Sequence, residues 1–113
     1  MDKKLSEIIK RVVDEVDPEK IILFGSRAVG GSQKYSDYDI CVLKKEIKDK
    51  RETIRRIYRK LLGVGVAVDV IVETTDRFEE LKDKWFLIYS EIAKRGKVVY
   101  EKRKVRSGMV TEG

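Results

Sequence analysis

The chain has 113 residues, of which 42% are apolar and 41% charged, and its 26 basic and 20 acidic residues give a net charge of +6. This length and mixture of charges predict one small globular domain and exclude a disordered chain. The absence of histidine and the single cysteine exclude Ser-His-Asp and Cys-His catalysis, histidine or cysteine zinc sites and an internal disulfide.

The first part of the chain predicts two short strands that follow a helix. Ser6 is a candidate N-cap, apolar residues follow it at helical spacing, and Asp17-Pro18 ends the pattern. We expect a helix over 6–17, a strand over 21–24, a turn at 25–26, a short helix beginning over 27–29, a loop over 30–36 and a strand over 37–43.

The second part repeats the alternation of helix and strand. We expect a basic helix over 44–62, a strand over 67–72, a helix carrying Leu81, Trp85, Ile88, Tyr89 and Ile92, and an edge strand over 98–100. This order predicts a layered α/β or α+β domain over residues 1–100, followed by a basic, flexible tail over 101–113.

Membrane association is not expected. No apolar run reaches the roughly 18 residues of a membrane-spanning helix, and the N-terminal residues lack the apolar region of a signal peptide. We therefore expect a cytoplasmic protein. The chain also has no asparagine and only one glutamine, Gln33, which favours a thermophilic source, with chance in a short chain as the alternative.

The turn at Gly25-Ser26-Arg27 lies between a predicted strand and a predicted helix. Such a turn can present backbone N–H groups to a phosphate, and glycine allows the phosphate to approach closely. The Ser26 hydroxyl and the Arg27 guanidinium would add donors. Alone, such residues more often form an ordinary turn and N-cap.

Three carboxylates interrupt the apolar strands. Asp37 and Asp39 are two residues apart, so both point to the same face of their strand, about 7 Å apart at Cα. Asp69 interrupts a run that reads as a central strand. A divalent cation would relieve the repulsion and the cost of burial. A solvated strand end for the pair, and an ion pair for Asp69, are the alternatives.

A phosphate-binding turn with three carboxylates suggests two-metal phosphoryl transfer. At these residues the chain resembles a known family. Gly25-Ser26, ten residues and then Asp37-x-Asp39 resemble the signature of the DNA polymerase β-like nucleotidyltransferase superfamily, and its minimal archaeal and bacterial members in particular. The resemblance implies an α+β nucleotidyltransferase fold, with a mixed, mainly antiparallel sheet and helices packed on one side. Val29 and Tyr38 depart from the residues that the family often has there.

The resemblance also implies roles for individual residues. The turn would hold the phosphates of ATP, two Mg²⁺ ions would be bound by carboxylates, and one carboxylate would draw the proton from the attacking hydroxyl. The implied nucleotide-binding residues are Gly25, Ser26 and Arg27, and the implied catalytic and metal-binding residues are Asp37, Asp39 and Asp69.

Minimal nucleotidyltransferases often act with a helical HEPN-type toxin. The resemblance therefore implies an antitoxin that transfers AMP from ATP to a tyrosine of that toxin. A nucleotidyltransferase for a small molecule or RNA, and a non-catalytic nucleotide- or partner-binding module, remain alternatives, as do homo- and hetero-oligomers. Nucleic-acid binding is not favoured, since the basic helix has no interleaved aromatic platform. Tyr58, Trp85, Phe86 and Tyr89 are expected in the core or a partner interface, and Cys41 in the core.

Overall fold

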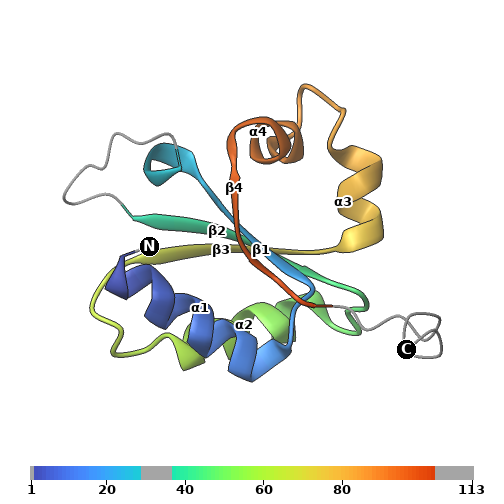
Figure 1. The fold of residues 1–113 in the computed structure, drawn as a ribbon. Coiled ribbons are helices and arrows are strands. Elements are labelled where there is room, and N and C mark those ends of the chain that lie inside the picture. Colours follow the sequence, from blue (N-terminus) through green and yellow to red (C-terminus); the bar gives the residue numbers. More distant parts are fainter. Residues whose placement is uncertain (1, 29–36, 104–113) are drawn as a thin grey trace, which may run out of the picture.

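A computed structural model describes residues 2–28 and 37–103 (Figure 1). The elements are α1 (Lys3–Val16), β1 (Lys20–Phe24), the 3₁₀ turn η1 (Gly25–Arg27), β2 (Tyr38–Lys44), α2 (Lys50–Lys60), β3 (Val68–Thr74), α3 (Thr75–Leu81), α4 (Ile88–Arg95) and β4 (Lys97–Glu101). The predicted loop over 30–36, the helix start at Val29 and the tail from 104 onward lie outside the described residues. Within the described residues, no helix has the length and apolar character needed to cross a membrane.

The four strands form one mixed sheet in the order β3-β2-β1-β4. Strand β1 is antiparallel to both β2 and β4, whereas β2 and β3 are parallel. The predicted α+β class and the mainly antiparallel sheet are therefore confirmed. Strand β4 lies at one edge, as expected for residues 98–100.

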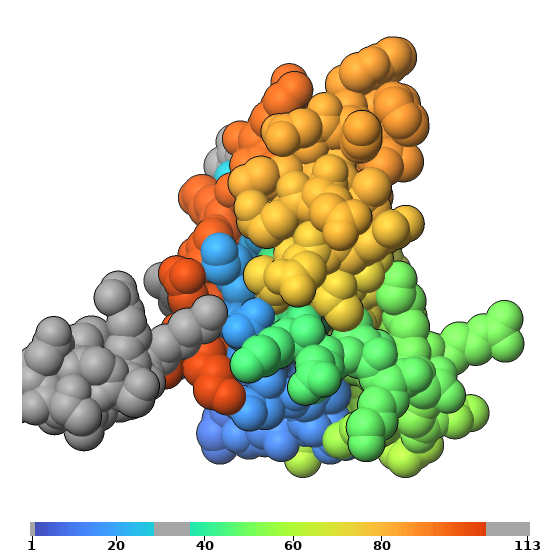
Figure 2. Space-filling view, turned by 90° about the vertical axis from the view of Figure 1, so that its right-hand side faces the viewer, coloured from blue at the N-terminus to red at the C-terminus, as the bar shows by residue number. Residues whose placement is uncertain are grey.

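Helices cover both faces of the sheet, so the prediction that they pack on one side is wrong. Helices α1 and α2 lie on one face, and α3 and α4 lie on the other (Figures 1 and 2). The cause is the unbroken apolar character of β1 and β2, which sends side chains to both faces. Residues Ile21, Leu23, Ile40 and Val42 join the core under α1 and α2, whereas Ile22, Phe24, Cys41 and Leu43 join the core under α3 and α4.

Three predicted helix limits differ from the structure. Asp2, not Ser6, caps α1, because its Oδ1 accepts a hydrogen bond from the Leu5 N–H at 2.6 Å. The basic helix begins at Lys50 rather than at residue 44, since Asp49 caps it. The predicted last helix is two helices separated by residues 82–87.

The sequence predicted one helix because apolar residues at the end of α3 and in α4 keep helical spacing across the segment that separates the two helices. Trp85 and Phe86 lie between these helices, and their exposed fractions are 81% and 66%. They therefore share no buried stripe with Ile92, which is fully buried in α4. Cys41 is buried as expected, and burial raises the pKa of its thiol to about 12.

Gly96 fixes the close packing of α4 against the sheet. A Cβ atom at this position would lie 2.5 Å from the Ile92 carbonyl oxygen and 2.6 Å from Ile22 Cγ2. Both distances are far below van der Waals contact, so any side chain here must push α4 away from β1.

We therefore expect Gly96→Ala to lower the free energy of unfolding by about 1–3 kcal/mol, the range for overpacked sites. Ala93→Ser is the control, since it adds one atom at an exposed position of the same helix and should change stability by less than about 0.5 kcal/mol. Urea denaturation of both variants measures the difference. Equal midpoints for Gly96→Ala and wild type would show that α4 has room to move.

Candidate functional site

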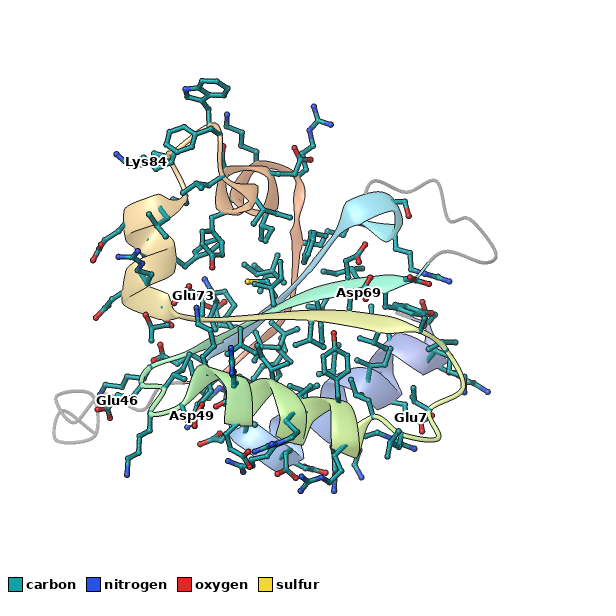
Figure 3. All side chains as sticks on the ribbon, turned by 180° about the vertical axis from the view of Figure 1, so that it is seen from behind. Glu7, Glu46, Asp49, Asp69, Glu73 and Lys84 are labelled. Carbon is teal, nitrogen blue, oxygen red and sulfur yellow. The ribbon has the colours of Figure 1, made fainter. Side chains whose placement is uncertain are left out.

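The predicted carboxylates lie where β1 ends and where β2 and β3 begin. In the sheet register, Phe24 at the end of β1 pairs with Asp39, and Asp39 pairs in turn with Asp69. Asp37 directly precedes β2. The structure therefore brings Asp39 and Asp69 side by side on neighbouring strands, and Figure 3 shows Asp69 at this end of β3.

Gly25 brings the turn after β1 directly against Asp39. Its φ of 74° lies in the left-handed region that favours glycine. A Cβ atom here would lie 2.3 Å from Asp39 Oδ2. The Gly25 carbonyl accepts the Ala28 N–H at 3.1 Å, which closes the turn, and Ser26 is exposed on it. The turn that carries Gly25 and Ser26 thus lies beside the Asp39 carboxylate.

The electrostatics of the site disfavour ionised Asp39. Burial raises the pKa of the Asp39 carboxyl, and the neighbouring carboxylates of Asp69 and Asp37 raise it further. Asp69 itself is exposed, because β3 is the edge strand and not the central strand that its sequence suggested. Among the described residues, no ion pair includes any of these three carboxylates. A bound cation would supply a counter-charge here.

The donor atoms at this site suit a hard divalent cation. They are all carboxylate oxygens, the ligands that Mg²⁺ prefers, and Mg²⁺ commonly completes its shell with water and substrate phosphates. In residues 2–28 and 37–103, no three acidic or cysteine side chains stand close enough to enclose a metal on their own. The two in-register carboxylates, Asp39 and Asp69, therefore fit one open side of a metal site rather than a closed cage.

Arg27 packs against an aromatic ring. Its guanidinium stands 3.9 Å from the centre of the Tyr38 ring, and the Tyr38 hydroxyl donates to Asp2 Oδ1 at 3.1 Å. Tyr38 packs in the core under α1, whereas Asp39, the next residue, points to the opposite face. The predicted contact of Arg27 with a triphosphate stays a prediction.

Comparisons with known proteins bear on this arrangement. Residues 3–105 match the family described as polymerase beta, nucleotidyltransferase. The chain belongs to this family. The resemblance drawn from the spacing of Gly25-Ser26 and Asp37-x-Asp39 is thereby confirmed.

A solved nucleotidyltransferase-like structure supports the fold. The crystal structure of a Sulfolobus solfataricus protein, provisionally described as a nucleotidyltransferase, aligns with a TM-score of 0.63 and 28% identity. The alignment covers 90% of this chain and 81% of that one. A search of curated proteins gives no significant match. In this nucleotidyltransferase fold, the in-register pair Asp39 and Asp69 occupies the end of the sheet that the turn at Gly25 approaches.

A polar cluster centred on Glu73, which sequence reasoning missed, lies at the other end of β3. The Glu73 carboxylate accepts hydrogen bonds from the Tyr89 hydroxyl at 2.7 Å, from Lys50 Nζ at 3.0 Å and from the Thr74 N–H at 3.1 Å. Burial opposes ionisation, but these three donors outweigh it and lower the pKa of Glu73. The signal was available, because Glu73 ends an apolar strand as Asp69 begins it.

The Glu73 cluster predicts a stability effect that depends on pH. A lowered pKa stabilises the fold above the ordinary value of 4.5, and this contribution is lost as the pH falls through the lower folded value. Tyr89→Phe removes one donor, so we expect a loss of about 1–3 kcal/mol at pH 7 that shrinks below pH 4.5. Thermal unfolding across this pH range measures it. A pH-independent loss, as from simple packing, would contradict the assignment.

Gly25→Ala tests the close approach of the turn to Asp39. Gly63→Ala is a matched control, since Gly63 has a similar φ of 83° but no atom within 4 Å of its Cβ position. Both variants carry backbone strain, and only Gly25→Ala adds the clash with Asp39. We expect Gly25→Ala to be less stable than Gly63→Ala by about 1–3 kcal/mol in urea denaturation. Equal losses would mean that Asp39 moves aside without cost.

Proposed function

We propose that the chain is a Mg²⁺-dependent nucleotidyltransferase that transfers AMP from ATP to a hydroxyl acceptor. One observation carries the proposal. The in-register carboxylates of Asp39 and Asp69 meet the turn at Gly25, with no basic partner for them among the described residues. Membership of the nucleotidyltransferase family supports the reaction class.

The proposed roles follow from the position of each group. The Ser26 hydroxyl and the backbone of the turn hold the phosphates of ATP, because the turn is exposed beside Asp39. Asp37 and Asp39 hold Mg²⁺, which when bound would offset the charge that develops on the triphosphate. Arg27, which belongs to the same turn and whose guanidinium lies on the Tyr38 ring, adds a donor to the phosphates.

Asp69 is proposed to accept the proton of the attacking hydroxyl and to share in holding the cation. It is exposed at the edge of the sheet, so an acceptor can reach it without entering the core. The acceptor oxygen bonds to the α-phosphorus, its proton passes to the Asp69 carboxylate, and pyrophosphate leaves. All atoms of ATP are then accounted for in the AMP ester and pyrophosphate.

The acceptor is proposed to be a tyrosine hydroxyl of a HEPN-type helical toxin, which AMP transfer would silence. The support is the resemblance of the chain to minimal nucleotidyltransferases that act with such toxins. Phenolic oxygen is a reasonable nucleophile here, since a neighbouring carboxylate can receive its proton.

Calorimetry with ATP, CTP, GTP and UTP, with and without Mg²⁺, tests the site. We expect ATP binding that requires Mg²⁺ and that Asp37→Asn/Asp39→Asn weakens at least tenfold. Asp14→Asn/Asp83→Asn is the control, since it removes the same charge at two exposed positions outside the site. Without divalent cation, Asp37→Asn/Asp39→Asn should be at least as stable as wild type, because it relieves the repulsion at Asp39.

Two outcomes would contradict the proposal. Tight ATP binding by the Asp37→Asn/Asp39→Asn variant would show that these carboxylates do not hold the nucleotide with its metal. For the toxin, mass spectrometry of a HEPN-type protein mixed with the chain, ATP and Mg²⁺ should show AMP on tyrosine. Silencing that survives the double substitution would exclude a catalytic antitoxin.

A further inference from the structure

Strand β3 carries Asp69 and has a neighbouring strand on one side only. Its inner side pairs with β2, and its outer side is an edge of the sheet. Helix α2 lies next to this strand on the face opposite α3 and α4 (Figures 1 and 3). From α2, the Tyr58 hydroxyl accepts a hydrogen bond from the Val70 backbone N–H at 2.9 Å.

This hydrogen bond holds the strand at the residue after Asp69. Successive residues of a strand bond alternately to its two sides. Since the Val70 N–H points outward to Tyr58, the Asp69 backbone faces inward to β2. The backbone around Asp69 is therefore held from both sides, by β2 on one and by the Tyr58 hydroxyl on the other.

The position of Asp69 needs such support, because two carboxylates of like charge are in register. Asp39 lies in β2, which has a strand on each side and is buried on both faces. Asp69 lies in the edge strand, so repulsion between the two would be relieved most easily by moving β3 outward. The Tyr58 hydroxyl stands on that outer side, 2.9 Å from the Val70 nitrogen, so outward movement of β3 would drive the Val70 amide against the hydroxyl and disrupt this hydrogen bond.

We propose that Tyr58 is a positioning residue that keeps Asp69 in register with Asp39. The inference rests on the proposed function in one respect, namely that Asp39 and Asp69 together hold the cation. Tyr58 itself touches neither carboxylate, and it acts through the backbone of Val70. The sequence predicted only that Tyr58 belongs to the core or to an interface, and its exposed fraction is 41%.

The test compares Tyr58→Phe with Tyr100→Phe. Both substitutions remove one phenolic oxygen, but Tyr100 lies in β4, at the opposite edge of the sheet. Hydrogen exchange of the Val70 amide, followed by NMR on the metal-free protein, reports the hydrogen bond. We expect Tyr58→Phe to speed this exchange at least about fivefold, the equivalent of one hydrogen bond of about 1 kcal/mol. Tyr100→Phe should leave it unchanged.

A second readout separates positioning from a merely structural role. Titration with Mn²⁺ in the presence of ATP measures the cation affinity of each variant, and thermal unfolding measures overall stability. We expect Tyr58→Phe to weaken Mn²⁺ binding severalfold, whereas Tyr100→Phe with a similar melting temperature retains wild-type affinity.

Each contrary result has its own meaning. Unchanged exchange at Val70 in Tyr58→Phe would overturn the inference, because the edge would then be held without the hydroxyl. Faster exchange with unchanged Mn²⁺ affinity would overturn it too, since Tyr58 would then be structural only. Failure of the wild-type chain to bind Mn²⁺ with ATP would instead overturn the proposed function, and with it the role of Tyr58 at the site.

Discussion

The juxtaposition of Asp39 and Asp69 is the constraint on which the rest of the site depends. Two carboxylates in register on neighbouring strands repel each other, and burial of Asp39 adds to the cost. The fold keeps them together with rigid parts: the Gly25 backbone stands against Asp39, and β2 is enclosed by strands and by helices on both faces. A cost that the surrounding structure sustains in this way is typical of a functional site.

The parts of the fold that could be predicted are those set by local sequence. The apolar runs of β1 and β2 predicted buried strands, which the structure shows. The register places Phe24 opposite Asp39 and so brings Gly25 close to Asp39, whereas their shared functional role stays a prediction. Burial on both faces of the sheet could also have been predicted, because polar and apolar residues do not alternate in these runs. The expectation of a one-sided sheet came from the resemblance and not from the residues.

The parts that could not be predicted depend on long-range pairing. Asp69 reads as part of a central strand because its neighbours are apolar, but only the strand order shows that β3 is an edge. Arg27 belongs to the turn that the sequence suggested as a phosphate site, but its packing on the ring of Tyr38 joins residues on either side of a loop and could not be predicted from local sequence. Trp85 and Ile92 are at helical spacing in the sequence, but Trp85 lies between α3 and α4. A pattern of apolar spacing does not reveal such a short break in a helix.

The two acidic residues of β3 show how the structure separates a stabilising carboxylate from one available for chemistry. Asp69 and Glu73 are four residues apart, so they point to the same face at opposite ends of the strand (Figure 3). Glu73 is buried, and its three hydrogen-bond donors lower its pKa. Asp69 is exposed beside another carboxylate and has no ion pair among the described residues. Two acidic residues of one strand therefore differ in role: Glu73 is tied into a hydrogen-bond cluster at one end, whereas Asp69 at the other end is exposed beside the Asp39 carboxylate.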